Sequence, residues 1–121
     1  DGTRRIFGIE AAIYSALNRN AFLFIDEIES SLHPRLVEFL LKKFLEIKNN
    51  RAQLLITTHY DPFLNEVDEL FRKDSVWFTE KNINGSTDLY SLVEFSRLNR
   101  ISSIQKAYRQ GNFGAVPKVN I

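Results

Sequence analysis

Two short apolar runs, residues 21–25 (AFLFI) and 53–59 (QLLITTH), limit the folds that are open to this chain. Each follows a segment in which apolar residues recur every three or four positions, the pattern of a helix with one buried face. Residues 5–59 are therefore predicted to form helix, strand, helix, strand. This alternation favours an α/β fold with a mostly parallel sheet and right-handed crossovers. An unbroken run such as AFLFI predicts a central strand covered on both faces.

The two helical segments have definite limits in the sequence. The first is predicted at residues 5–18 and the second begins at Pro34, because proline suits the first turn of a helix. Their inward-facing stripes are expected to be Ile6, Ile9, Ile13 and Leu17 in the first helix and Leu36, Val37, Leu40, Leu41, Phe44 and Ile47 in the second.

The second half of the chain predicts a different arrangement. A short helix is expected at residues 62–71. Residues 75–81 and 87–95 flank Asn84-Gly85, a favoured turn pair, and so predict an antiparallel hairpin at the edge of the sheet.

The C-terminal end predicts one more helix and a packed tail. The helix is expected at residues 101–110, with Ile101, Ile104 and Tyr108 inward and Gly111 as its stop signal. The tail at residues 112–121 has four large apolar residues and is expected to dock on another surface, which the sequence does not identify. We find no repeat and no linker in the sequence, so we expect one domain.

The composition excludes several classes of protein. A chain of 121 residues, 44% of them hydrophobic, can bury a core. Sixteen basic and fifteen acidic residues leave a net charge of +1, so no overall field attracts nucleic acid or anionic lipid. The apolar runs are too short to span a bilayer and there is no signal-peptide pattern, so we expect a soluble, cytoplasmic protein without membrane contact. The start at DGTRR and the absence of methionine favour a piece of a longer protein.

The acidic pair Asp26 and Glu27 directly follows the first apolar run. Burying an ionised carboxylate costs several kcal/mol or more, so such a pair needs a positive partner. In nucleotide hydrolases, a carboxylate at the tip of such a strand holds Mg²⁺ and a neighbouring group deprotonates the attacking water. Asp26 is thus a candidate magnesium ligand and Glu27 a candidate general base. The alternative is a salt-bridged pair at a strand end.

Two further features point to the same chemistry. His59 follows the second apolar run, at the end of a strand where sites in open parallel sheets gather, and can donate a hydrogen bond to a terminal phosphate. Gly2 and Thr3 precede the first predicted helix, with Arg4 and Arg5 adding charge, and predict an anion site. The alternatives are a histidine bonded to backbone and an ordinary helix start.

These segments, in this order and spacing, resemble the C-terminal half of an ABC-type ATPase head of the branch that contains SMC, Rad50 and RecF proteins. More narrowly, they resemble AAA15 or AAA-ATPase-like proteins found beside restriction and abortive-infection systems. On that resemblance, residues 1–5 end the signature motif, residues 22–27 are the Walker B motif, residues 30–33 stand at the D-loop and His59 is the switch histidine. The hairpin and residues 111–117 also resemble this family, so the likeness covers nearly the whole chain.

The resemblance implies a set of ligands and partners. ATP and Mg²⁺ are the expected cofactors, with Asp26 on the metal and Glu27 and His59 in catalysis. The nucleotide is expected to contact Gly2, Thr3, Arg4 and Ser31. Two heads of a homodimer are expected to close around ATP, in a DNA-related or phage-defence system with a nucleic acid or an effector protein as a further partner.

Two departures from the family pattern limit this expectation. His33 stands where transporter heads commonly have an aspartate. The sequence contains no G-x-x-x-x-G-K-[ST], so the phosphate loop is missing. Residues 1–121 are therefore expected to be the C-terminal part of a single head domain, and to bind ATP poorly when alone.

Two other functions fit the same residues. Asp26, Glu27 and Glu29 are clustered carboxylates of the kind that build two-metal nuclease sites. A docking domain whose acids are merely salt-bridged is the non-enzymatic alternative.

Overall fold

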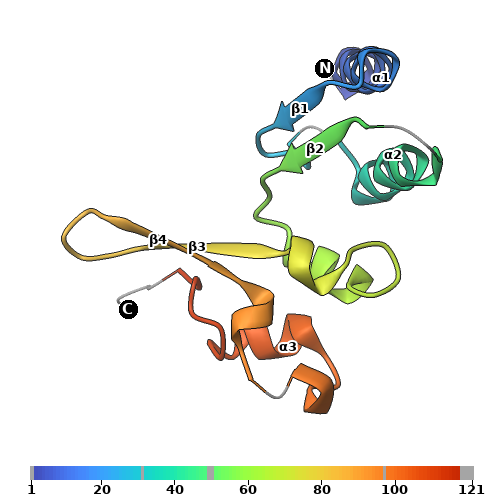
Figure 1. The fold of residues 1–121 in the computed structure, drawn as a ribbon. Helices are drawn as coiled ribbons and strands as arrows, with labels where there is room; N and C mark the ends of the chain where they lie inside the picture. The colour runs from blue at the N-terminus through green and yellow to red at the C-terminus, as the bar shows by residue number, and fades with distance from the viewer. Residues whose placement is uncertain (1, 31, 49–50, 97, 118–121) are drawn as a thin grey trace. The chain divides into compact units, whose positions relative to one another are not determined.

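The computed structural model describes residues 2–30, 32–48, 51–96 and 98–117 (Figure 1). The chain divides into two compact units, the N-terminal unit Asp1–Tyr60 and the C-terminal unit Asp61–Ile121. Each unit contains a sheet of two strands. Among the helices of the described ranges, none is long and apolar enough to cross a membrane.

The N-terminal unit has the predicted helix, strand, helix, strand order. Its elements are α1 (Gly2–Arg19), β1 (Phe22–Ile25), α2 (Pro34–Glu46) and β2 (Gln53–Ile56). The two strands pair in parallel, with Phe22 opposite Gln53 and Ile25 opposite Ile56. The α/β class and the parallel sheet expected for this part of the chain are thereby confirmed.

The helices of this unit bury most of the predicted stripes. Helix α1 contacts β1 and α2, and the buried helix residues are Ile9, Ile13, Ala16, Val37, Leu40, Leu41 and Phe44. His33 caps α2, because its Nδ1 accepts the Arg35 N–H at 3.2 Å, and Pro34 follows at the first helical position. Leu36 and Ile47 were expected to face inward but are 40% and 46% exposed. Both flank the buried stripe, one at the first turn and the other just past the last.

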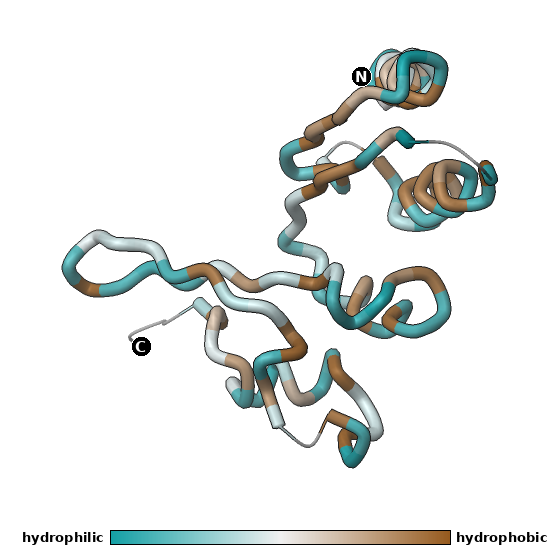
Figure 2. Tube along the Cα trace, viewed as in Figure 1, coloured by the Kyte–Doolittle hydropathy of each residue, from teal (hydrophilic) through white to brown (hydrophobic). Residues whose placement is uncertain are grey.

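The sheet of the N-terminal unit is covered on one face only, which corrects the expectation for β1. Side chains along a strand point alternately to opposite faces. Leu23, Ile25, Leu54 and Ile56 are half-buried on one face, whereas Phe22, Phe24 and Leu55 on the other face are 61%, 52% and 51% exposed. Figure 2 shows these strands as hydrophobic segments. The apolar run predicted that both faces of β1 would be buried. The described residues bury only one of them.

The C-terminal unit is built around the predicted hairpin. Its elements are the 3₁₀ turns at Asp61–Glu66, Lys73–Ser75, Leu92–Glu94 and Leu98–Arg100, the strands β3 (Trp77–Lys81) and β4 (Thr87–Ser91), and helix α3 (Ile104–Arg109). The strands are antiparallel, and Gly85 occupies the turn at φ +89°, a left-handed conformation that favours glycine. The short helix expected at 62–71 is a 3₁₀ turn, and the final helix is shorter than predicted.

The placement of the hairpin at the edge of the parallel sheet was wrong for the described residues. β3 and β4 pair with each other in a separate sheet. The physical reason is that later residues of the C-terminal unit pack on the inner face of the hairpin. Phe78, which is 7% exposed, stacks on Phe113 and Tyr108 with ring centroids 5.5 and 5.9 Å apart, so the chain after the hairpin folds back over it.

The tail docks on the hairpin, as expected from its apolar content, over the residues that the structure describes. The Tyr90 hydroxyl donates to the Phe113 carbonyl at 2.6 Å, and the Tyr108 hydroxyl donates to the Ala115 carbonyl at 3.2 Å. Between them Gly114 has φ +68°, and a Cβ there would lie 2.9 Å from the Tyr90 hydroxyl. This position therefore requires glycine.

An ion pair ties the start of the C-terminal unit to α3. Both Asp61 carboxylate oxygens accept from the Arg109 guanidinium, at 2.9 and 3.0 Å, and Gln105 donates a further bond at 3.0 Å. The bond from Arg109 is the main cause that lowers the pKa of the Asp61 carboxyl, against the opposing effect of burial. Asp61 is thus held as a carboxylate between two elements.

Candidate functional site

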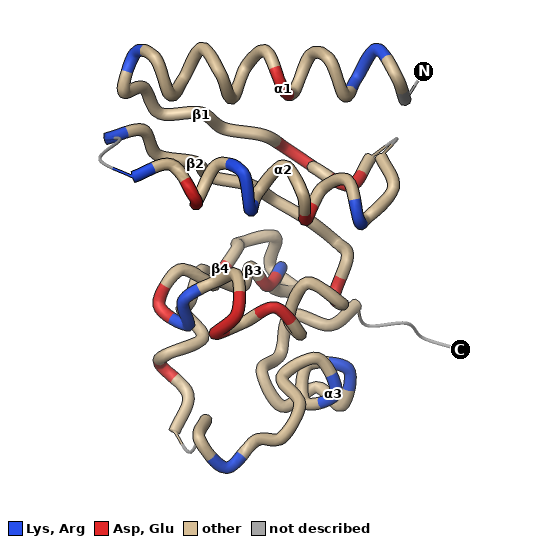
Figure 3. Tube along the Cα trace, turned by 90° about the vertical axis from the view of Figure 1, so that its right-hand side faces the viewer, with Lys and Arg blue, Asp and Glu red and all other residues tan. Residues whose placement is uncertain are grey.

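The candidate catalytic residues meet at one edge of the parallel sheet. Asp26 and Glu27 directly follow β1, where Figure 3 shows an acidic segment, and His59 lies three residues beyond the last residue of β2. Because the strands are parallel, their carboxyl ends lie together. His59 Nε2 is 3.3 Å from Glu27 Oε1, with side chains 84% and 55% exposed. Glu27 and His59, which the sequence analysis gave separate roles, are thus in contact, and both side chains are open to solvent or a ligand.

Thr57, which directly follows β2, forms hydrogen bonds with both acidic residues. Its hydroxyl oxygen accepts the Glu27 N–H at 2.8 Å and donates to Asp26 Oδ1. Its backbone donates to the Ile25 carbonyl at 3.0 Å and accepts the Ile28 N–H at 3.1 Å. One threonine thus fixes the Asp26 carboxylate and the Glu27 backbone together. Sequence reasoning missed Thr57, although pairing Ile25 with Ile56 would have placed the next residues side by side.

Glu27 has an unusual backbone conformation that other residues hold in place. Its φ is +48°, in the left-handed region that residues other than glycine rarely adopt. Arg5 Nη2 donates to the Glu27 carbonyl at 3.2 Å, and the Ser30 N–H donates to the same oxygen at 2.9 Å. Arg5 was expected to add charge to an anion site, and here it links α1 to the backbone of the candidate base.

Glu29 holds the backbone of the histidine. Its Oε1 accepts the His59 N–H at 2.8 Å, across the two strand ends. Burial raises the pKa of the Glu29 carboxyl. Hydrogen bonds from the His59 N–H, the Thr58 hydroxyl and its own N–H outweigh that effect, so the pKa lies below its usual value. Glu29 is therefore a carboxylate near neutral pH, committed to the His59 segment.

This geometry does not favour the two alternative interpretations of the acids. Among the described residues, no group of three histidine or acidic side chains could hold a metal ion. Glu29 Oε1 accepts the His59 N–H. The ion pairs of the same residues include none that joins Asp26 or Glu27 to a lysine or arginine. Neither a three-carboxylate metal cluster nor a salt-bridged acid pair is formed there.

The oxygen atoms at the strand ends fit a magnesium nucleotide. Asp26 is exposed, and its carboxylate lies with the Thr57 hydroxyl in a donor set made of oxygen alone. Magnesium prefers oxygen ligands and is usually bound by one or two carboxylates together with substrate phosphates and water. A single carboxylate is therefore sufficient on the protein side.

The remaining predicted site residues lie at the start of α1 and beyond β1. Gly2, Thr3 and Arg4 form the first turn of α1, with Thr3 and Arg4 exposed. Arg5 reaches the Glu27 carbonyl, so the start of α1 lies within one side chain's length of the strand ends. Ser31 lies outside the described residues.

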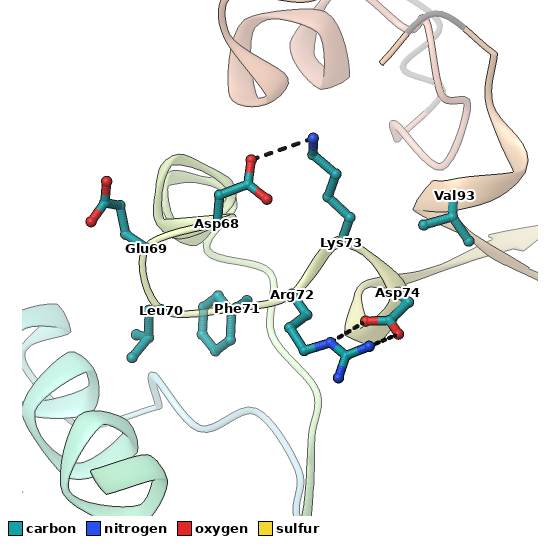
Figure 4. A pocket seen from close by; sticks show the side chains of 8 residues that line it. All are labelled: Asp68, Glu69, Leu70, Phe71, Arg72, Lys73, Asp74 and Val93. Atoms are coloured by element: carbon teal, nitrogen blue, oxygen red, sulfur yellow. Dashed lines mark hydrogen bonds and ion pairs between the residues drawn. The ribbon is translucent and has the colours of Figure 1, made fainter. Parts of the chain in front are cut away.

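The C-terminal unit has a pocket of different character (Figure 4). It has a volume of about 420 Å³ and is lined by residues 68–74 and Val93. Lys73 pairs with Asp68 at 3.4 Å and Arg72 pairs with Asp74 at 2.6 Å, as the dashed lines of Figure 4 show. Both cations of the pocket are thus neutralised within the chain, so it offers no concentrated charge for a phosphate.

Comparison with known families gives a match that covers the N-terminal unit. Residues 1–66 match the family described as AAA domain, putative AbiEii toxin, Type IV TA system. The matched segment contains α1, β1, α2 and β2, and with them every site residue discussed for the strand ends. No curated protein and no solved structure matches the chain.

Proposed function

The chain belongs to the AAA-domain family that residues 1–66 match, and from this premise we propose that it is part of an ABC-type ATPase head that hydrolyses ATP. The contact between His59 Nε2 and Glu27 Oε1, at 3.3 Å on adjacent strand ends, carries the proposal. It joins a carboxylate that can accept a proton to a histidine that can donate to a phosphate. The head belongs to the SMC, Rad50 and RecF branch by its motif order.

The residues of the strand ends have separate roles in the reaction. Glu27 accepts a proton from the water whose oxygen attacks the γ-phosphorus, while the bond from that phosphorus to the β,γ-bridging oxygen breaks. His59 donates a hydrogen bond to a γ-phosphate oxygen and stabilises the charge of the transition state. Asp26 would hold magnesium, which when bound would neutralise charge on the phosphates. Thr57 keeps Asp26 and Glu27 in register.

A complete site requires residues from two heads. The sequence has no phosphate loop, so another part of the protein supplies it. The partner head of a homodimer presents Gly2 and Thr3 to the same nucleotide, and Arg4 and Ser31 are further nucleotide-binding residues. The exposed positions of Thr3 and Arg4 in the first turn of α1 support this role, since the N-terminus of a helix attracts anions. ATP then joins the two heads, and its hydrolysis releases them.

The family description suggests the setting of this activity. It names a toxin of a type IV toxin–antitoxin system, and we place the ATP cycle of this chain in a defence or DNA-related process. The further partner is a nucleic acid or an effector protein. With a net charge of +1, contact with nucleic acid depends on a local patch and not on the overall field.

Substitution of Glu27 in the full-length protein tests the proposal. Glu27→Gln removes the base and is expected to lower kcat by about 10² to 10⁴, while ATP binding persists and the dimer lives longer. Phosphate release measures turnover, and sedimentation with ATP measures the dimer. Glu46→Gln, at an exposed position on α2, is the matched control and should behave as wild type. Turnover close to wild type in Glu27→Gln contradicts the role of Glu27.

A further inference from the structure

We infer that Glu29 is a positioning residue of the ATPase site, acting through His59. The inference rests on the proposed function and adds to it a residue that touches neither the nucleotide nor the water. Glu29 lies four residues beyond the last residue of β1, whereas His59 lies three residues beyond the last residue of β2 and thirty residues after Glu29. The side chain of one strand end thus sets the position of the other.

The hydrogen bond from His59 N–H to Glu29 Oε1 is the first step of the argument. At 2.8 Å it is short for a bond between a backbone amide and a side chain, and the acceptor is charged. Residues 57–60 have no regular secondary structure, so the sheet gives this amide no ladder partner. Glu29 supplies the partner that strand pairing would otherwise provide.

The exposure of His59 is the second step. The imidazole is 84% exposed, and its Nε2 lies 3.3 Å from Glu27 Oε1. Few neighbouring atoms pack against this imidazole, so they contribute little to its position. The position of the ring is then set by the His59 Cα atom, from which all of its rotamers extend. A shift of the His59 backbone therefore moves the Nε2 atom away from its place beside the candidate base.

A reciprocal arrangement of the two loops is the third step. Thr57, before His59, holds the acids that follow β1, and Glu29, after the acids, holds the histidine that follows β2. The two links run in opposite directions across the same pair of strand ends. Together they fix the separation of Glu27 and His59, on which the proposed chemistry depends. Loss of either link leaves one member of the pair free to move.

A double-mutant cycle in the full-length protein tests this role. Glu29→Ala removes the acceptor and is expected to lower kcat about 10- to 100-fold, with KM for ATP changed by less than about threefold. In a His59→Ala background the same substitution should cost less than about twofold, because there is no imidazole left to position. If the fold-decrease of kcat in the double variant equals the product of the decreases in the two single variants, the inference is overturned.

Two further measurements separate positioning from a general structural role. Hydrogen exchange at the His59 amide should become faster in Glu29→Ala, and Glu29→Gln, which keeps an acceptor oxygen, should restore part of kcat. Unchanged exchange at that amide overturns the inference. If Glu29→Ala does not fold, Glu29→Asp withdraws the carboxylate by one methylene and should show the same dependence on His59.

The outcome also distinguishes this inference from the proposed function. A full-length protein that does not hydrolyse ATP overturns both. A protein that hydrolyses ATP and loses that activity in Glu27→Gln, but keeps its kcat in Glu29→Ala, overturns the role of Glu29 alone. Glu10→Ala, at an exposed position on α1, is the control for removal of an acidic side chain.

Discussion

The two units cover their strands in different ways. In the C-terminal unit the inner face of the hairpin is sealed by aromatic rings, with Phe78 in contact with four of them. In the N-terminal unit one face of the parallel sheet is covered by its own helices, and Phe22, Phe24 and Leu55 on the other face stay exposed. The C-terminal unit thus covers the inner face of its hairpin with its own residues, although Trp77 and Leu89 on the strands stay exposed. In the described part of the N-terminal unit, one whole face of the sheet is open and mostly apolar.

The difference shows which interactions hold the residues of each unit in place. The catalytic candidates stand on the half-covered sheet, and side-chain hydrogen bonds from Thr57, Glu29 and Arg5 fix them. No aromatic core surrounds them in the described part of the chain. Under the proposed function, the part of the head that supplies the phosphate loop is expected to cover this open apolar face. Substitutions should accordingly affect folding in the C-terminal unit and turnover in the N-terminal unit.

The largest expected effect is a loss of stability when the aromatic core of the C-terminal unit is disrupted. Phe78→Ala should lower the free energy of unfolding by about 3–5 kcal/mol, because a buried ring is removed from a packed cluster. Denaturant titration followed by near-ultraviolet circular dichroism measures the change. A cost below about 1 kcal/mol would show that the unit does not depend on this cluster, and would break the comparison.

A smaller effect, on activity, is expected at Thr57 in the full-length protein. Thr57→Val removes the hydroxyl at nearly constant volume and should lower kcat about 10- to 100-fold, because Asp26 and Glu27 lose their common partner. Thr57→Ser keeps the hydroxyl and should recover most of that loss. Thr79→Val makes the same change at an exposed position of β3 and should leave turnover unchanged. Equal kcat values for all three variants would show that the Thr57 hydroxyl has no role in turnover.

Local patterns predicted much of the N-terminal unit. The order of its elements follows from periodicity, and the meeting of Glu27 with His59 follows from the ends of two parallel strands. Both inferences need only the sequence near each element and one rule of topology. The turn at Gly85 was likewise predictable, because a left-handed position in a hairpin favours glycine.

Features that depend on distant partners could not be predicted in the same way. The link from Glu29 to His59 requires the strand register and the path of a loop without regular structure. The positive φ of Glu27 depends on Arg5, twenty-two residues away, and no local signal marks it. The separate sheet of the hairpin depends on the tail that covers Phe78, and a strand pattern alone does not reveal which segment will cover it.

The smallest expected effect is at Phe24 in the 121-residue chain. Phe24→Ala makes the same change as Phe78→Ala, but at a half-exposed position on the open face of β1. We expect a cost of about 1 kcal/mol, from partial burial and strand propensity together. Denaturant titration of both variants under identical conditions measures the contrast between the two units.

The same substitution in the full-length protein sharpens the comparison. If the missing part of the head covers the open face, Phe24 becomes a core residue there and its loss should cost about 3–5 kcal/mol, as at Phe78. Phe39→Ala, at an equally exposed position on α2, is the control and should cost about 1 kcal/mol in both proteins. A cost at Phe24 that stays near 1 kcal/mol in the longer protein would mean that this face remains open, and the exposed side of β1 would then need another explanation.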